Sequence, residues 1–484
     1  MSKEKTPQEM KGSYIAIECL KRADIKVVFA YPGGTSMELH QAMRESGIRV
    51  ILPRHEQGGA FAAAAFARAT GKTGVCMATS GPGATNLITG IADAYMDSIP
   101  LVAITGQVPS TLIGKNAFQE IDIIGMTRPI AKHSYLVLDA ADLPAIFAEA
   151  FHIANSGRPG PVVIDIPKNV QQQICKPIFP AKHIPRVYRQ ENLSVTKSQI
   201  EDIQNAIKKS EKPCIYAGGG IIASGAAKDL TKFAESYNIP VVTSLMGIGA
   251  IPEQHPLSLK WLGMHGTVYA NKAANLSDLL IVIGARFSDR VAGPTSSFAK
   301  NATIIHIDID PSEINKNVLA DIEIIADAKE VLQALNKNPI RKKYAEWHAQ
   351  IAEWRKKFPL KYSQDGKLHA PYVIETLYKV TKGDAIIVTG VGQHQMWSAQ
   401  YYNYKRPRQL ISSGGLGAMG FGLPSAMGVK IACPKDLVID IDGDGSFQMN
   451  IQELGTIHTE EIDVKMIIMN NQHLGMVAQW EDRF

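Results

Sequence analysis

Three alternating aspartates in the stretch DIDGDGSFQMNI could bind a metal ion; they are Asp440, Asp442 and Asp444. Their spacing resembles the start of a calcium loop, which also needs a preceding helix and a glutamate at position twelve. Here position twelve is Ile451, and the preceding DLVIDI is β-branched and apolar, as in a strand. The sequence therefore disfavours calcium, and Asp440 and Asp442, which precede the turn, are expected to be structural.

A second apolar run, VKMIIMNNQHLGM, predicts a strand that ends at Asn471. The residues between Asp444 and Asn471 predict a turn, a helix and this strand, which is one βαβ crossover with neighbouring strand tips. Mg²⁺ is usually held by a few protein oxygens together with substrate phosphates. Asp444 and Asn471 therefore predict a magnesium–diphosphate site, where Gly443 and Gly445 allow close backbone approach. The alternative is an Asp-Gly turn followed by a helix cap.

Short apolar runs such as IKVVFAYPGG, TGVCMATSGPG and DLLIVIGAR alternate with helix-like stretches along the chain. This pattern is typical of parallel strands joined by crossover helices, and ligands then bind beyond the carboxyl ends of the strands. Residues 170–198 and 334–371 break the alternation and are interpreted as linkers. The sequence predicts an α/β fold with three doubly wound parallel-sheet domains, at residues 1–180, 190–340 and 365–484, the last of them C-terminally incomplete.

The composition excludes several classes of partner. The chain has 484 residues, of which 45% are hydrophobic and 20% charged, with a net charge of +5. That balance predicts a mixed solvated surface that binds neither nucleic acid nor membrane. IRKKYAEWHAQIAEWRKKF predicts one exposed amphipathic helix. Five scattered cysteines without a CxxC pair, and an N-terminus without an apolar signal core, predict a cytoplasmic protein with buried thiols and no membrane span.

A larger resemblance is carried by motifs from the whole chain. GDG followed by NN is similar to the thiamine diphosphate signature. The chain is identified as resembling the catalytic subunit of the acetolactate (acetohydroxyacid) synthase family by GDGSFQMNIQELGTI, GMVAQW, TGVGQHQMWSAQ, GGLGAMGFGLPSA, YPGGTSMELH, RHEQGGAFAAAAFARATG, SGPGATNLITGIADAYMDSIPLVAITGQV and GARFSDR. The resemblance implies a pyrimidine-binding first domain, a central Rossmann-like FAD-binding domain and a diphosphate-binding last domain.

The resemblance implies roles for four residues of the first domain. Glu56, in RHEQGG, would hydrogen-bond the pyrimidine ring of thiamine diphosphate and drive its tautomerisation. Without the resemblance, Glu56 would be interpreted as an acid at a helix N-terminus. Phe118 and Gln119, in NAFQE, would face the reacting substrate. Lys168 ends VVIDIPK near the site entrance, and its alternative is a solvated lysine.

In the last domain the resemblance implies the remaining thiamine diphosphate contacts. Asp444, Asn471 and the backbone carbonyl of His473 would hold Mg²⁺. Met419 would be the bulky wedge that folds the cofactor, although a Met in a Gly-rich loop usually serves packing alone. The residues expected to contact the cofactor are Glu56, Val391, Gln393, His394, Gly417, Met419, Gly443, Asp444, Gly445, Ser446, Asn471 and Met476.

The middle domain is expected to bind FAD. CIYAGGGI is a weak signal because it is not GxGxxG, whereas TIIHIDID ends in Asp308 and Asp310, where acids often meet ribose. RFSDR resembles the biosynthetic, FAD-binding type. Arg290, Trp480 and Met264 would receive the second 2-keto acid, with the Arg290 guanidinium pairing with its carboxylate. The expected FAD contacts are Arg158, Gly218, Gly219, Gly220, Met264, His265, Gly266, Gly284, Arg286, Asp308 and Asp327.

The implied reaction decarboxylates pyruvate and transfers the two-carbon unit to a second pyruvate or to 2-ketobutyrate, the first common step of branched-chain amino-acid biosynthesis. A homodimer or dimer of dimers with interfacial active sites, and a small regulatory subunit, are also implied. Glu56 argues against the alternative of a glyoxylate carboligase, and RFSDR with GMVAQW argues against a pyruvate oxidase. A further alternative is a truncated cofactor-binding subunit with little activity, because the chain ends four residues after Trp480.

Overall fold

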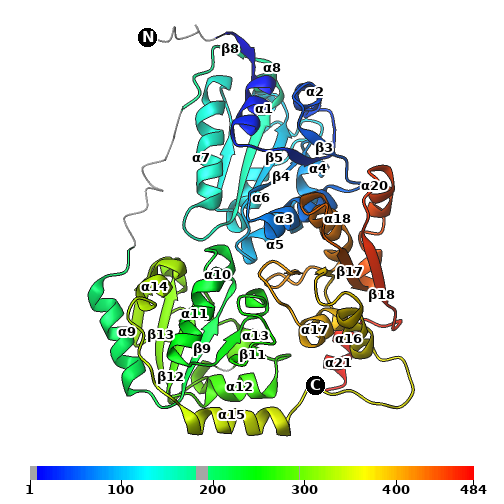
Figure 1. Cartoon of the computed structure of the whole chain (residues 1–484). Helices are drawn as coiled ribbons and strands as arrows, with labels where there is room; N and C mark the ends of the chain where they lie inside the picture. Colours follow the sequence, from blue (N-terminus) through cyan, green and yellow to red (C-terminus); the bar gives the residue numbers. More distant parts are fainter. Residues whose placement is uncertain (1–7, 181–193, 294, 484) are drawn as a thin grey trace. The chain divides into compact units, whose positions relative to one another are not determined.

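The structure is a computed structural model that describes residues 8–180, 194–293 and 295–483. It contains three α/β domains, each built on its own sheet (Figure 1), so the predicted α/β class with three domains is confirmed, whereas incompleteness of the last domain is not. The chain packs into two compact units, made of residues 1–190, 388–392 and 411–484 in one case and 191–387 and 393–410 in the other. The middle of the first predicted linker, residues 181–193, lies outside the described residues.

The first domain has a six-stranded sheet in the order β3-β2-β4-β5-β7-β6, and its pairs are all parallel. Its elements are β1 (Met10–Lys11), α1 (Gly12–Arg22), β2 (Val27–Ala30), α2 (Met37–Arg44), β3 (Arg49–Ile51), α3 (Glu56–Thr70), β4 (Gly74–Ala78), α4 (Pro82–Asn86), α5 (Ile88–Met96), β5 (Leu101–Gln107), α6 (Ile123–Thr127), β6 (His133–Leu136), α7 (Leu143–Asn155), β7 (Pro161–Pro167), α8 (Lys168–Gln172) and β8 (Ile174–Cys175).

Alternating side chains of the first sheet enter two different cores, as strand geometry requires. Val75 and Met77 pack with residues of α1, α2 and α7. Cys76 and Ala78, on the opposite face, pack with residues of α3 and α5. Helices therefore cover both faces of the sheet, which is the doubly wound arrangement.

Helix α18 (Gly422–Ala432), which belongs to the third domain, packs closely on α3 within the same unit. A Cβ added to Gly428 would lie 2.1 Å from the backbone oxygen of Ala62. The rings of Phe61 and Phe421 meet edge to face with centroids 5.3 Å apart. Small residues along both helices permit this approach, so the start of α3 is placed beside the third domain.

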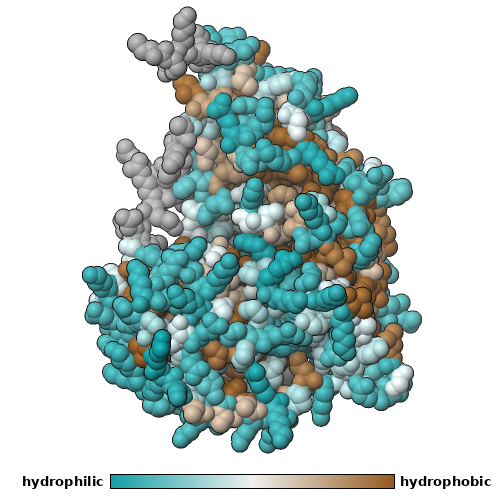
Figure 2. Space-filling model, viewed as in Figure 1, coloured by the Kyte–Doolittle hydropathy of each residue, from teal (hydrophilic) through white to brown (hydrophobic). Residues whose placement is uncertain are grey.

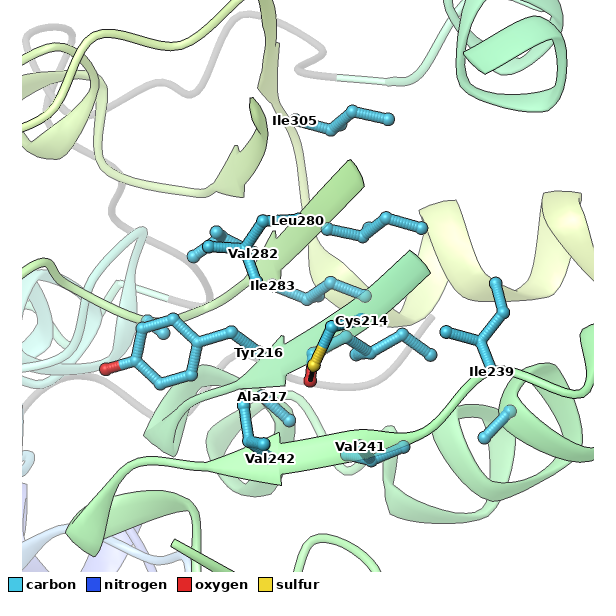
Figure 3. Packing of buried hydrophobic residues seen from close by; sticks show 14 of the residues in the cluster. Cys214, Tyr216, Ala217, Ile239, Val241, Val242, Leu280, Val282, Ile283 and Ile305 are labelled. Carbon is cyan, nitrogen blue, oxygen red and sulfur yellow. Dashed lines mark hydrogen bonds between the residues drawn. The ribbon is translucent and has the colours of Figure 1, made fainter. Parts of the chain in front are cut away.

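The middle domain has a parallel six-stranded sheet in the order β11-β10-β9-β12-β13-β14. Figure 3 shows the side chains of β9, β10 and β12 packed in its core. Its elements are α9 (Lys197–Lys209), β9 (Pro213–Ala217), α10 (Gly219–Ala223), α11 (Ala227–Tyr237), β10 (Val241–Thr243), β11 (Ser258–Trp261), α12 (Val268–Asn275), β12 (Leu279–Ile283), α13 (Asp289–Ala292), β13 (Thr303–Asp308), β14 (Ile322–Ile325), α14 (Ala328–Leu335) and α15 (Ala345–Lys357).

Helix α15 is the amphipathic helix that the sequence predicts, but it is more than a linker. Trp347 and Ile351 are buried in the core of the middle domain. The Trp347 Nε1 donates a hydrogen bond to the backbone oxygen of Pro213, 3.0 Å away. The second predicted linker, residues 334–371, therefore adds a helix to the middle domain.

The third domain has a four-stranded sheet in the order β16-β15-β17-β18, in which β17 and β18 pair in parallel. The two-residue strand β16 was not predicted from the sequence. The elements are α16 (Ala370–Val380), β15 (Ile386–Thr389), α17 (Gln393–Tyr401), β16 (Leu410–Ile411), α18, β17 (Val438–Gly443), α19 (Asp444–Gln448), α20 (Glu453–Thr459), β18 (Lys465–Met469) and α21 (Gly475–Glu481).

Side-chain burial tests two of the composition-based predictions. Cys19, Cys76 and Cys214 are buried, and burial raises the pKa of each thiol to about 12, as expected for inert core cysteines. Cys175 and Cys433 are only partly buried. The visible face in Figure 2 mixes hydrophilic and hydrophobic residues. None of the helices in the described ranges has the length and apolar character needed to cross a membrane.

Candidate functional site

The tips of β17 and β18 bring Asp444 and Asn471 to one edge of the third sheet. Gly443, the last residue of β17, pairs with Met469, the last residue of β18, as the crossover prediction requires. Within the described residues, the partly exposed Asp444 carboxylate accepts no hydrogen bond. The Asn471 Oδ1 accepts a hydrogen bond from the His473 backbone N–H, 3.0 Å away. The available oxygens suit a Mg²⁺ ion that also binds a diphosphate.

Ser446, in α19, hydrogen-bonds two loops at this edge of the sheet. Its buried Oγ accepts hydrogen bonds from the backbone N–H of Gly420, 3.1 Å away, and of Val391, 3.4 Å away. Gly417 lies in the loop that ends at Gly420 and has a φ of +69°, in the left-handed region that favours glycine. The expected cofactor residues Val391, Gly417 and Met419 are thus carried by two loops that meet at α19, which carries Ser446.

Asp440 and Asp442 lie behind the edge and are buried, which agrees with a structural role. In the described part of the chain, the Asp440 carboxyl oxygens have no hydrogen-bond partner. Burial, reinforced by the neighbouring Asp442, raises the pKa of Asp440 well above its usual range. A Cβ on Gly422 would lie 2.6 Å from Asp440 Oδ1, so glycine lets α18 begin against these carboxyls.

The loop that carries Met419 is held by buried charges that sequence reasoning missed. Arg68 forms ion pairs with Asp93, at 2.7 Å, and with Asp97, at 2.9 Å, and the three side chains are at most 3% exposed. The Ser413 hydroxyl donates to Asp93 at 2.5 Å. The Asp97 carboxylate accepts the backbone N–H groups of Gly414 and Gly415. The only sequence signal was the pair of acids in the otherwise apolar stretch GIADAYMD.

Glu56 is the first residue of α3 and is 9% exposed. The Asn86 Nδ2 donates a hydrogen bond to its Oε2, 2.9 Å away. A Cβ on Gly83 would lie 3.2 Å from the Glu56 Oε1, so this carboxylate faces α4, the short helix that follows β4. A nearly buried carboxylate with one amide donor can hold or take a proton from a bound heterocycle.

The backbone of Gln119 lies next to Gly81, at the start of α4. Its φ is +60°, and a Cβ on Gly81 would lie 2.8 Å from its backbone oxygen. Because Gly81 is the N-cap of α4 and Glu56 contacts residues of that helix, the structure brings Gln119 and Glu56 into one region. Phe118 is 87% exposed, and Lys168 starts α8 at the tip of β7.

A buried network supports the loop that carries Gln119. Gln107 Nε2 donates to the Ile121 backbone oxygen, 2.9 Å away, and to Asp165 Oδ2, 3.0 Å away. The Thr105 hydroxyl donates to Asp165 Oδ1, 2.6 Å away. Burial is the main reason why the pKa of Asp165 rises from 3.8 to about 7, against these two donors.

This raised pKa should make stability depend on pH. Between about pH 4 and 7 the folded protein holds a proton on Asp165 that the unfolded chain has lost, so stability falls as pH rises through this window. Above about pH 7 the raised pKa of Asp165 lowers the free energy of unfolding by about 4 kcal/mol. We expect Asp165→Asn to reduce the fall in thermal midpoint between about pH 5 and about pH 8.5. Calorimetric scans would contradict this prediction if the thermal midpoint fell by the same number of degrees in Asp165→Asn and in the unmodified chain.

In the middle domain, the tips of the adjacent strands β9 and β12 carry some of the residues expected to bind FAD. Gly218 follows β9 and Gly284 follows β12, and these strands are adjacent. A Cβ on Gly218 would lie 2.1 Å from the Gly284 oxygen, and one on Gly220 would lie 2.7 Å from the Gly284 Cα. Backbone packing therefore already requires these glycines. Their place at the carboxyl edge of a parallel sheet also fits a dinucleotide.

The acids near this edge have local hydrogen bonds. Asp308 Oδ1 accepts the Asp310 N–H at 2.9 Å, and Asp327 caps α14 through the Lys329 N–H, also at 2.9 Å. The Tyr216 hydroxyl donates to the Arg286 backbone oxygen. Arg158 belongs to the other compact unit, where its Nε donates to the Ser98 hydroxyl at 2.8 Å.

Two of the three residues expected to receive the second substrate lie together. The Met264 N–H donates to the Arg290 backbone oxygen, 2.9 Å away, and both side chains are exposed. The Gln400 Nε2 supports this loop through the His265 oxygen. Trp480, the third residue, is 38% exposed and belongs to the other compact unit.

Comparison with known families agrees with the three domains seen in the fold. The matches are to the thiamine pyrophosphate enzyme N-terminal TPP binding domain over residues 10–126, the central domain over residues 200–335 and the C-terminal TPP binding domain over residues 390–484. The chain is thus a thiamine pyrophosphate enzyme in its fold and domain order.

Comparison with individual proteins narrows the class. The chain is 53% identical to an acetolactate synthase of Arabidopsis thaliana, with 99% of this chain and 72% of the relative aligned. It is 53% identical to acetolactate synthase 1 of Nicotiana tabacum and to that of Oryza sativa, with 98% of this chain and 72% and 75% of the relatives covered. The chain belongs to the acetolactate synthase family.

Proposed function

We propose that the chain catalyses the acetolactate synthase reaction, in which pyruvate is decarboxylated and its two-carbon unit joins a second pyruvate or 2-ketobutyrate. The observation that carries the proposal is the pairing of the Asp444 and Asn471 strand tips in the same compact unit as the buried Glu56. The identity with acetolactate synthases over nearly the whole chain supports the same reaction.

The side chains divide the work of binding and activating the cofactor. Bound thiamine diphosphate supplies an electron sink for decarboxylation. Asp444 and Asn471, with the His473 carbonyl, would hold the Mg²⁺ and through it the diphosphate. Glu56 would hold a proton shared with the pyrimidine ring, and its low exposure strengthens that hydrogen bond. Met419 would press the two rings together.

FAD and the second substrate would be bound largely by the middle domain. The FAD contacts would come from the tips of β9, β12 and β13 and from Arg286. Arg290 would pair with the carboxylate of the second 2-keto acid, because a guanidinium binds a carboxylate through two parallel hydrogen bonds. Met264, whose backbone is held by that of Arg290, would line the same pocket.

The proposal includes a homodimer with active sites at the interface. Several large apolar side chains between residues 449 and 480 are exposed, which supports a surface covered by another chain. Figure 2 shows apolar surface on the side where α20 and β18 are drawn in Figure 1. The exposed apolar residues between positions 449 and 480 are Met449, Ile451, Leu454, Ile468, Leu474, Val477 and Trp480.

The small regulatory subunit and the cytoplasmic location remain predictions, and the curated relatives named above are chloroplastic.

The test is product analysis of the purified chain with pyruvate, thiamine diphosphate, Mg²⁺ and FAD under air. We expect acetolactate without hydrogen peroxide, and no product when thiamine diphosphate or Mg²⁺ is omitted. Peroxide formation would identify an oxidase instead. Absence of any product from a folded, cofactor-loaded chain would overturn the proposed activity.

A further inference from the structure

A buried carboxylate of the third domain reaches the start of α3, next to Glu56. Glu453 is the first residue of α20 and is 0% exposed. Its Oε1 accepts the backbone N–H groups of Arg54 and His55, both 3.0 Å away, and its Oε2 lies 3.1 Å from the same Arg54 nitrogen. The Thr456 hydroxyl also lies 3.0 Å from Oε2. All these residues belong to one compact unit.

The contact between Glu453 and the start of α3 depends on a residue of α3 as well as on Glu453 itself. A Cβ on Gly58 would lie 2.5 Å from the Glu453 Oε1, so only glycine at this position lets the carboxylate reach the start of the helix. Burial raises the pKa of Glu453, and the N–H groups of Arg54 and His55 oppose this rise. The bonds to these two donors are partly buried, so removing the carboxylate would leave both N–H groups without this acceptor.

The geometry fixes the backbone from which Glu56 projects. His55 is the N-cap of α3, and its Nδ1 accepts the Gln57 N–H at 3.1 Å. Glu453 holds the N–H groups of the two residues immediately before Glu56. The Glu56 side chain is then oriented separately, through Asn86. A helix start without such partners would be free to shift, because its first N–H groups have no acceptors within the helix.

We propose that Glu453 is a positioning residue for Glu56, so that the third domain sets the place of the proton-sharing carboxylate in the first domain of the same chain. The inference rests on the proposed function, because Glu56 has its role only in thiamine diphosphate chemistry. Misplacing a reacting group by about 1 Å can cost on the order of 100-fold in rate. Glu453 should therefore act on proton exchange more than on cofactor affinity.

The first measurement needs no cofactor. In Glu453→Ala, amide hydrogen exchange of the cofactor-free chain should show faster exchange at residues 54–57, while the rest of α3 keeps its protection. Glu453→Gln retains one acceptor oxygen and should stay close to the unmodified chain. Glu460→Ala is the matched control, since it removes an exposed ion pair with Arg49 between the same two domains. Unchanged exchange at residues 54–57 in Glu453→Ala would overturn the inference.

The second measurement is the exchange of the C2 proton of bound thiamine diphosphate with deuterium, followed by proton NMR. We expect Glu453→Ala to slow it by about 10- to 100-fold, with cofactor affinity within about threefold. Glu453→Gln should recover most of the rate, and Glu460→Ala should not change it. If Glu453→Ala does not fold, Thr456→Val is the fallback; it removes a hydroxyl that lies 3.0 Å from both the Glu453 Oε2 and the Leu52 backbone oxygen, and it should slow exchange by about threefold or more. An unchanged rate in a folded variant would refute positioning.

Glu56→Gln in the same assay separates the two proposals. If Glu56→Gln leaves C2 exchange unchanged, the role given to Glu56 in the proposed function fails. If Glu56→Gln slows exchange and Glu453→Ala does not, the proposed function stands and the positioning role of Glu453 is wrong.

Discussion

Glu56→Gln is expected to slow proton removal at C2 of bound thiamine diphosphate by at least about 100-fold, which is the usual scale of a lost general acid or base. Cofactor binding should persist, because the diphosphate would be held by Asp444 and Asn471. The glutamine carbonyl can still accept the hydrogen bond that Asn86 now donates to Glu56 at 2.9 Å, so the local structure should survive. Stopped-flow turnover and calorimetric cofactor titration would measure the two effects separately.

A second variant, with a smaller expected effect, makes this prediction stricter. Asn86→Ala removes the amide that orients the carboxylate and should reduce turnover less than Glu56→Gln does. The acid itself remains in that variant, 9% exposed at the start of α3. A Glu56→Gln enzyme with turnover within about twofold of normal would show that another group shares the proton.

Asp444→Ala is expected to lower the affinity for thiamine diphosphate in the presence of Mg²⁺ by at least about 100-fold, because a metal ligand is lost. The Asp444 carboxylate accepts no hydrogen bond within the described residues, so its removal should disturb local structure little. Thermal unfolding without cofactor should therefore be nearly unchanged. Isothermal titration of thiamine diphosphate at saturating Mg²⁺ gives the affinity.

The matched control for the metal site is Asp463→Asn. Asp463 precedes β18 in the same domain, is exposed, and forms an ion pair with the nearby Lys465. It should bind thiamine diphosphate as the unmodified chain does. Retention of full affinity in Asp444→Ala, with the control also unchanged, would mean that Asp444 is not a ligand and that the Asp-Gly turn is structural.

The strand tips were predictable because their cause is local. Apolar runs that end in Gly, Asp or Asn predict parallel strands, and a crossover of known length places the two tips together. Asp444 and Asn471 follow from that rule alone. The start of α3 at Glu56 was likewise expected from an acid at a helix N-terminus. The resemblance to acetolactate synthases then supplied the chemistry for both positions.

Other assignments needed the folded chain. Residues 334–371 were interpreted as a linker, but Trp347 and Ile351 of α15 are buried in the middle domain. The spacing of charged and apolar residues predicted the helix correctly, but it could not show which core the apolar face of the helix would join. Gly218 and Gly220, interpreted as cofactor glycines, also serve direct backbone packing against Gly284.

The sequence by itself determined the α/β class, the strand tips and the residues at them, because strand alternation and turn residues act over a few positions. Only the tertiary structure decided how those residues are held. Glu453 lies 399 positions after Arg54, and Asp93 lies 320 positions before Ser413. A buried donor needs an acceptor, but packing, rather than sequence pattern, selects which distant side chain provides it.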